Sequence, residues 1–197
     1  MVQPLNYLRE TPSQTAGPYV HIGLAPGAAG FDIYRAELGF DPLPDEVPGD
    51  RIRITGCVFD GMGAPVKDVL IEVWQADGSG LYPGQGGCAP GFRGWARVVP
   101  DFETGLFTLD TILPGPVPGP GGRMQAPHLS LWLVARGINT GLQTRMYFPD
   151  QDNAADPVLN LIEQPHRRQT LIATGEGGSY RFDIHLQGDT ETVFLDV

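Results

Sequence analysis

The sequence has few of the residues that crosslink small proteins or bind phosphate. Among 197 residues there are two cysteines, Cys57 and Cys88, and they lack the paired spacing of a zinc site or disulfide framework. Only one of the 13 basic residues is a lysine, Lys67, and the formal net charge is −10. Nucleic-acid affinity depends on Lys and Arg neutralising phosphates, so this charge argues against a nucleic-acid partner.

Long apolar runs are also missing. No run reaches the 18 residues or so of a membrane-spanning helix, and the N-terminus lacks a basic region followed by an apolar core. The unpaired cysteines fit a reducing compartment. We therefore expect a cytoplasmic protein with no membrane partner.

Glycine and proline are abundant, with 27 and 19 residues, while charged residues make up only 18% of the chain. Together with 41% hydrophobic content, this composition predicts an ordered, loop-rich, all-β protein. The prolines before residue 50 favour turns over regular elements. We expect residues 1–50 to form an irregular N-terminal arm and wrapping segment, and residues 51–197 a β-sandwich domain.

The central stretch is Pro127–Arg136, an almost unbroken apolar run of strand length. Such a run predicts a strand buried on both faces of a sandwich or barrel. His128 and Ser130 are two residues apart, so a strand projects them to the same face. Arg136 lies at the strand exit, before Gly137.

Other segments have strand-like alternation or turn signals at their ends. Thr104-Gly105 is a hairpin signal, and Asp156-Pro157 predicts the start of a short helix over Pro157–Ile162, with another turn from Pro165. The pattern predicts an antiparallel β-sandwich with one or two short helices. The remaining predicted strands are Arg51–Phe59, Val69–Ala76, Ala96–Val99, Leu106–Ile112, Leu142–Phe148, Ser179–Leu186 and Thr192–Leu195.

Spacing alone gives no complete active site. Three of the four histidines, His21, His166 and His185, are isolated in sequence, and the single His-x-Ser pair offers one good metal ligand where a site needs three or four. No Gly-x-Ser-x-Gly motif supports an α/β-hydrolase. A helix cap and a solvated face explain the acidic residues from Asp152 to Glu163.

Several motifs, in order along the chain, resemble the intradiol ring-cleavage dioxygenases. The resemblance runs from about Leu8 to Val197 and implies a β-sandwich. The motifs that carry it are Thr-Pro-Ser-Gln-Thr-Ala-Gly-Pro-Tyr at Thr11–Tyr19, Glu-Val-Trp-Gln-Ala-Asp at Glu72–Asp77, Ala-Pro-His-Leu-Ser-Leu at Ala126–Leu131, Pro-Val-Leu-Asn-Leu-Ile-Glu-Gln-Pro at Pro157–Pro165 and Tyr-Arg-Phe-Asp-Ile-His-Leu-Gln-Gly at Tyr180–Gly188.

Catalytic members of this family hold a ferric ion with two tyrosines and two histidines. By resemblance, Tyr82 and His128 match one ligand of each kind, while Val117 and Ser130 replace the other two. Gln125 stands where the catalytic chain has an arginine near the iron. Fe(III) requires anionic oxygen ligands, so we expect these vestigial metal positions to hold no catalytic iron.

The resemblance implies a non-catalytic subunit paired with a homologous, iron-bearing chain. This chain would complete the partner's substrate pocket with Thr15, Gly17, Pro18, Tyr19 and Arg136. The implied reaction is the O2-dependent cleavage of protocatechuate to 3-carboxy-cis,cis-muconate, in the catabolism of aromatic compounds through the beta-ketoadipate pathway. The guanidinium fork of Arg136 suits an aromatic carboxylate.

Two alternatives stay open. The chain could be a self-sufficient intradiol dioxygenase acting on another catechol, although Val117 and Ser130 argue against this. It could also be a non-enzymatic β-sandwich protein whose ligand pocket descends from an old iron site. Co-purification with an iron-bearing partner chain would distinguish these hypotheses.

Overall fold

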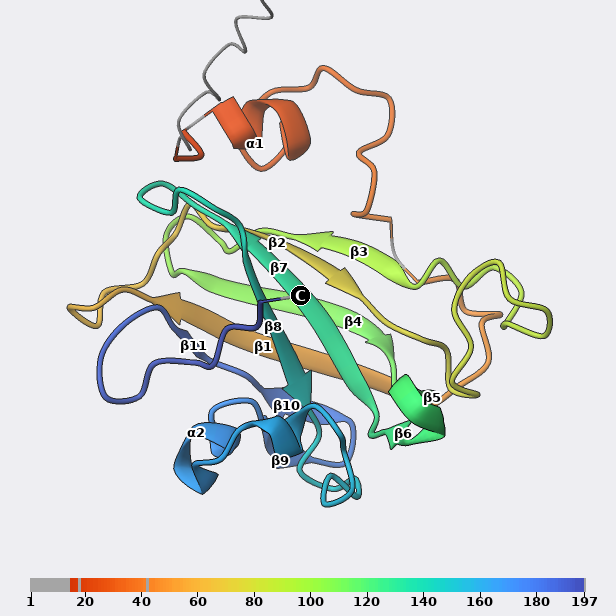
Figure 1. The fold of residues 1–197 in the computed structure, drawn as a ribbon. Coiled ribbons are helices and arrows are strands. Elements are labelled where there is room, and N and C mark those ends of the chain that lie inside the picture. The colour runs from red at the N-terminus through yellow and green to blue at the C-terminus, as the bar shows by residue number, and fades with distance from the viewer. Residues whose placement is uncertain (1–14, 18, 42, 197) are drawn as a thin grey trace, which may run out of the picture.

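Two β-sheets pack face to face in a computed structural model that describes residues 15–17, 19–41 and 43–196 (Figure 1). The predicted all-β sandwich is confirmed. The division into an arm of residues 1–50 and a sandwich of residues 51–197 stays a prediction.

The first sheet is built around β1 (Arg51–Phe59), whose Ile52 and Ile54 are buried while Arg51 and Arg53 are exposed. One side of β1 pairs with an antiparallel strand, and the other side pairs with two short parallel strands, so this sheet is mixed. The partners are β4 (Leu106–Ile112), β10 (Ser179–Arg181) and β11 (Ile184–His185), with β9 (Thr174–Glu176) antiparallel to β10.

The second sheet is antiparallel throughout, in the order β3-β2-β7-β8. The predicted hairpin at Thr104-Gly105 is wrong, because β3 pairs with β2 while β4 pairs with β1 in the other sheet. The chain therefore crosses between the sheets at this turn. The strands are β2 (Leu70–Trp74), β3 (Trp95–Val98), β7 (His128–Val134) and β8 (Leu142–Tyr147).

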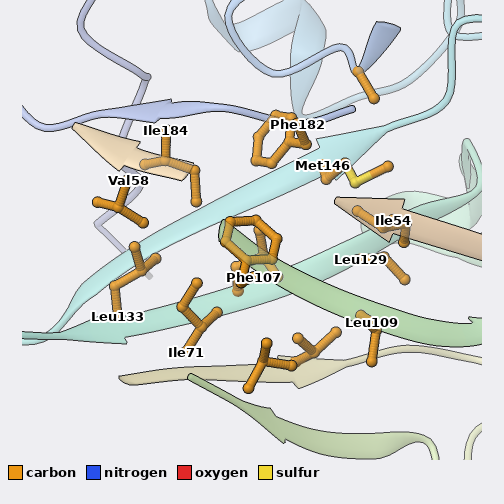
Figure 2. Packing of buried hydrophobic residues seen from close by; sticks show 14 of the residues in the cluster. Ile54, Val58, Ile71, Phe107, Leu109, Leu129, Leu133, Met146, Phe182 and Ile184 are labelled. Atoms are coloured by element: carbon orange, nitrogen blue, oxygen red, sulfur yellow. The ribbon is translucent and has the colours of Figure 1, made fainter. Parts of the chain in front are cut away.

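The main hydrophobic core lies between the sheets, where alternate side chains of each strand meet (Figure 2). Ile54, Val58 and Phe107 of the first sheet face Ile71 and Leu133 of the second. Only one face of each strand enters this core. The outer face of β7 is less covered than the predicted burial on both faces, since Ser130 and Trp132 are half-buried.

The helices are short and lie outside the sandwich. Along the chain they are α1 (Tyr19–Leu24), the 3₁₀ turns η1 (Pro120–Gly122) and η2 (Leu159–Leu161), and α2 (Pro165–Gln169). A separate two-stranded ribbon comprises β5 (Val117–Pro118) and β6 (Met124–Gln125).

Three local predictions need correction. The expected helix Pro157–Ile162 is only the 3₁₀ turn η2, and its Leu161 is 78% exposed. The expected strand Thr192–Leu195 has no strand geometry. The arm over residues 1–50 is predicted to be irregular, but its described part contains the short helix α1.

The corner after β2 depends on two buried polar side chains. The Nε2 group of Gln75 donates to the carbonyl of Ile112 at 2.9 Å, and Oε1 of Gln75 accepts from the hydroxyl of Thr111 at 2.8 Å. Asp77 accepts from the backbone N–H groups of Ser79, Leu81 and Ala89. These bonds hold the loop that follows β2 in place. They also explain why two polar residues, Gln75 and Asp77, are buried just after this strand.

Across the described residues, no helix has the length and apolar character that crossing a membrane requires.

Candidate functional site

Two of the four predicted vestigial metal positions, His128 and Ser130, lie on the outer face of the second sheet. Cross-strand pairing places Ser130 of β7 directly between Trp74 of β2 and Arg145 of β8. His128, two residues before Ser130 on the same face, pairs with Tyr147. The sheet thus supplies a row of polar and aromatic side chains facing away from the hydrophobic core.

The loop after β2 brings Tyr82 to this face. Gly80, at φ +76°, lies so close to the carbonyl of Pro116 that a Cβ atom would come within 2.1 Å of that oxygen. The close approach ties the loop to the segment that precedes β5. The ring of Tyr82 stacks on Trp74, with centroids 6.0 Å apart and planes 6° from parallel.

The ribbon β5-β6 brings Val117 and Gln125 to the site as a cross-strand pair. Directly opposed residues of an antiparallel ribbon project to the same side. Val117 is buried, and Nε2 of Gln125 donates to the carbonyl of Pro118 at 3.3 Å. Val117 therefore offers no donor atom, and the amide of Gln125 is held by its own ribbon.

Arg145 joins the elements around these positions. Its Nη1 atom donates to Oε1 of Gln125 at 2.7 Å and to the hydroxyl of Tyr147 at 3.2 Å. The Tyr147 hydroxyl in turn donates to the buried carboxylate of Asp156 at 3.1 Å. Both direct acceptors of Arg145 are neutral, and among the described residues no carboxylate lies within 4 Å of its guanidinium.

Burial and the charge of Arg145 shift the pKa values of His128 and Tyr82. Burial lowers the pKa of His128 to about 4, and the charge of Arg145 acts in the same direction. Nδ1 of His128 lies 2.7 Å from the carbonyl of Ala126, which accepts from the imidazole when Nδ1 carries its proton. Burial raises the pKa of Tyr82, and the nearby Arg145 only partly opposes this shift. Near neutral pH the site therefore contains a neutral imidazole and a neutral phenol.

These residues do not fit a ferric ion. A hard trivalent cation needs anionic oxygen donors, but Val117 offers no donor atom and Ser130 offers only an alcohol hydroxyl, so Tyr82 is the single residue of the four that could supply one. The charge of Arg145 would repel a second cation. Within the described ranges, no group of three or more His, Cys, Asp or Glu side chains could hold a metal ion.

A second candidate site lies beyond the other end of β7, where the arm meets Arg136. The hydroxyl of Thr15 accepts from the backbone N–H of Gly137 at 2.5 Å and donates to the carbonyl of Ala135 at 3.3 Å. These two bonds hold the backbone on both sides of Arg136. Structure thus brings together two predicted substrate-binding residues that are 121 positions apart in sequence.

Further along the arm, Gly17 and Tyr19 lead into α1. The carbonyl of Gly17 accepts from the N–H of Val20 at 3.0 Å, and Tyr19 is 80% exposed. Tyr19 makes no side-chain hydrogen bond within the described part of the chain, so its ring and hydroxyl are available. The predicted site residue Pro18 lies outside the described residues.

His21 packs α1 against the sandwich. Its side chain is buried, and its ring centroid lies 5.4 Å from that of Phe102. Burial lowers the pKa of His21, while the neighbouring charge of Asp68 partly opposes the shift. A neutral, buried imidazole therefore fixes the arm beside the turn before β2.

Asp68 also contacts Arg136. Its Oδ2 atom lies 3.0 Å from Nη2 of Arg136, and the two side chains are 30% and 71% exposed. An ion pair as exposed as this one is weak, so the guanidinium can exchange Asp68 for another carboxylate. Unlike Arg145, Arg136 is open to solvent and to external ligands.

Sequence reasoning missed Arg145, Asp68 and His21. Their roles depend on which strands and turns are neighbours in space, and local patterns do not give this information. The alternation of β8 gives no signal for Arg145, because this residue shares the outer face of the strand with Gln143, where polar residues are expected.

Comparisons with known proteins show the family of this chain. A family model described as dioxygenase matches residues 35–188. The chain is 48% identical over 199 residues to the protocatechuate 3,4-dioxygenase alpha chain of Pseudomonas putida, covering 98% of this chain and 99% of that protein. It is 36% identical over 159 residues to the beta chain of Burkholderia cepacia, covering 73% of this chain and 67% of that protein.

Solved structures show the same fold. The 3-chlorocatechol 1,2-dioxygenase of Rhodococcus opacus superimposes with a TM-score of 0.57 and 26% sequence identity. The match covers 73% of this chain and 62% of that structure, so this chain spans less than two thirds of that relative.

Proposed function

This chain belongs to the intradiol ring-cleavage dioxygenase family, and we propose that it is a non-catalytic subunit that completes the substrate pocket of an iron-bearing partner. The partner would be a homologous chain of the beta type. The substrate would be protocatechuate, a catechol that carries a carboxylate. Ring cleavage with O2 would take place at the partner's iron.

The distance between the two candidate sites carries this proposal. From His128 to Arg136 there are eight residue steps, which span about 26 Å in an extended strand. In Figure 1 the loop after β7 lies beside α1, while the ribbon β5-β6 lies at the other end of β7. A substrate held by Arg136 is therefore out of reach of the chain's own vestigial positions. The ring of a substrate whose carboxylate is bound there would therefore be cleaved at an iron of another chain.

The chemistry at the arm suits such a substrate. The planar guanidinium of Arg136 can bind a carboxylate with two parallel hydrogen bonds. The exposed ring of Tyr19 offers an apolar face and a hydroxyl to an aromatic ring. Since Thr15 holds the backbone on both sides of Arg136, it would orient the fork toward the substrate.

In the proposed complex, the partner's ferric ion supplies the activation of the catecholate toward O2. This chain binds the carboxylate, orients the ring and excludes water from the shared pocket. The two free cysteines, Cys57 and Cys88, support a place in the reducing cytoplasm.

The test compares the full chain purified alone with the chain co-expressed with its candidate beta-type partner. Iron content and protocatechuate-dependent O2 uptake are measured for both preparations. The proposal expects the lone chain to be colourless and inactive, and the complex to be coloured, iron-loaded and active. Iron and turnover in the lone chain would favour a self-sufficient dioxygenase instead. Their absence from both preparations would favour a binding protein.

A further inference from the structure

The side of α1 that packs on the sandwich carries a histidine where an apolar residue would fit. His21 is 4% exposed, and its ring lies against Phe102 in the turn between β3 and β4. Nε2 of His21 is enclosed and has no hydrogen-bond partner among the described residues. A buried polar atom without a partner costs about 1–3 kcal/mol. Packing alone therefore does not explain why this residue is a histidine.

The burial of His21 fixes how α1 is rotated about its axis. Residues of an α-helix follow one another at about 100°, so Tyr19 and His21 lie on nearly opposite sides. Ala25, four positions after His21, is fully buried on the same side, and its N–H donates to the carbonyl of His21 at 2.8 Å. With this side against the sandwich, the ring of Tyr19 points away from it, which agrees with its 80% exposure.

The two ends of this part of the arm are held by other contacts. At one end, the hydroxyl of Thr15 bonds to the backbone that follows β7. At the other end, Nη1 of Arg97 in β3 donates to the carbonyl of Leu24 at 3.0 Å. Between these points, His21 is the one fully buried side chain of α1. It is therefore the contact that sets the direction of Tyr19.

The surroundings of His21 suit a neutral imidazole. Four charged residues lie on the two turns nearest to it, and they are Lys67, Asp68, Asp101 and Glu103. Asp101 accepts from backbone N–H groups of its own turn, and Glu103 is exposed. Lys67 donates to a backbone carbonyl, and Asp68 is already paired with an arginine. Burial of His21 outweighs the charge of Asp68 and lowers the pKa of the imidazole.

We propose that His21 is a positioning residue, whose neutral imidazole aims Tyr19 into the partner's substrate pocket and whose protonation releases α1 from the sandwich. The inference rests on the proposed function, since Tyr19 acts in that pocket. Below about pH 6.5 the solvated histidine of a released arm binds a proton that the docked arm excludes. Docking of α1 therefore weakens as the pH falls, and substrate binding through Tyr19 weakens with it.

The first test needs no partner and follows the docking of α1 in the full chain by hydrogen exchange. The protection of the Ala25 amide, relative to an unstructured peptide at the same pH, is measured at pH 7 and pH 5.5. It should fall by about three- to fivefold in the wild type. In His21→Phe, which keeps a ring against Phe102 but cannot take up a proton, it should stay within about 1.5-fold. The matched control His166→Phe, at an exposed histidine of α2, should behave like the wild type. Equal falls in the wild type and in His21→Phe would overturn the proposal.

The second test asks whether His21 acts through Tyr19 in the complex with the iron-bearing partner. Variants with native circular dichroism are compared by the KM for protocatechuate at pH 7. His21→Ala should raise this KM by about fivefold with little change in kcat, and His21→Phe should stay within about twofold of the wild type. H21A/Y19A should have the same KM as Tyr19→Ala alone, because the anchor has nothing left to aim. Additive effects of the two substitutions would overturn the proposal, since His21 would then act on stability in general.

Failure of the proposed function would look different. The wild-type complex would then lack iron or turnover, and no variant could change a KM. The exchange experiment would still decide whether His21 is the acid-sensitive anchor of α1, because it uses this chain by itself.

Discussion

Two arginines, one near each end of β7, differ in exposure and in bonding partners. At its start, Arg145 pairs with Ser130, is half-buried and donates to neutral oxygens. Beyond its end, Arg136 is 71% exposed and touches one partly exposed carboxylate, that of Asp68. The first arginine is built into the fold, whereas the second is available to a ligand. Solvation and bonding partners, more than residue type, decide which cation can recognise a substrate.

The two ends of β7 should therefore have different roles: the end near Arg145 is the structural end, and the end near Arg136 is the recognition end. At the start of the strand, buried polar groups bond to one another and hold loops in place, so changes there should act mainly on stability. At the other end, few bonds hold exposed groups in position, so changes there should act mainly on substrate binding. Five substitutions test this division.

Asp156→Ala should give the largest effect, a loss of about 3–5 kcal/mol of unfolding free energy. The carboxylate accepts from the hydroxyl of Tyr147 and from the backbone N–H groups of Ala126, Val158 and Leu159. Removing it leaves these buried donors unpaired. Thermal denaturation should show a midpoint lower by roughly 12 °C.

The matched control for this prediction is Asp152→Ala. That carboxylate is exposed and accepts one hydrogen bond, from the N–H of Ala154. Its loss should cost less than about 1 kcal/mol. Similar destabilisation by both substitutions would contradict the role of Asp156 as the buried acceptor of the network.

His128→Asn should remove part of the pH dependence of stability. The pKa of His128 in the folded chain is about 4, below its ordinary value of 6.5, because burial disfavours the charged form. Between these values the unfolded chain binds a proton that the folded chain does not, so wild-type stability falls as the pH drops from 6.5 toward 4. From pH 7 to pH 5 this group contributes a loss of about 2 kcal/mol.

Urea denaturation at pH 7 and pH 5 measures that loss in both proteins. The asparagine variant should lose about 2 kcal/mol less than the wild type over this interval. His21 remains in both proteins, so its own contribution cancels in the comparison. An unchanged pH dependence would mean that His128 is not the buried neutral imidazole described above.

Much of the strand layout could be predicted from the sequence, but the pairing of the strands and the contacts within the two sites could not. The alternation of apolar residues is enough to predict β1 and β4 at their observed bounds, because burial of one face imposes that period. The same local patterns cannot say which sheet a strand joins, so the turn at Thr104-Gly105 was taken for a hairpin. The short helix α1 was missed because six residues carry too little periodicity.

The resemblance to a family pointed to Thr15, Tyr19 and Arg136, and the structure brings Thr15 and Arg136 together. Asp68 and Arg145 could not be found in that way. Their importance comes from cross-strand register and from charge at close range, which appear only when the chain is folded.

At the recognition end, Thr15→Val in the complex with the partner should raise the KM for protocatechuate by about three- to tenfold. The hydroxyl that holds the backbone around Arg136 is lost, while the exposed position makes the loss of stability small. Thr15→Ser should restore the wild-type KM because it keeps the hydroxyl. An unchanged KM with valine would show that the arm does not position Arg136.

Asp68→Asn should give the smallest effect, about a twofold decrease in the KM for protocatechuate. The Asp68 carboxylate competes with the substrate carboxylate for the guanidinium of Arg136, and the amide competes less well. Steady-state kinetics of the complex at low and moderate salt measures this change. A large increase in KM would instead mean that Asp68 orients Arg136.

The most direct test of the division between the two ends is the substrate preference of the complex carrying Arg136→Ala. Catalytic efficiency is measured with protocatechuate and with catechol, which lacks the carboxylate. We predict that kcat/KM falls by about thirtyfold for protocatechuate, with little change for catechol and unchanged iron content. Equal losses for both substrates, or no loss for either, would contradict the assignment of Arg136 to the substrate carboxylate in a partner's site.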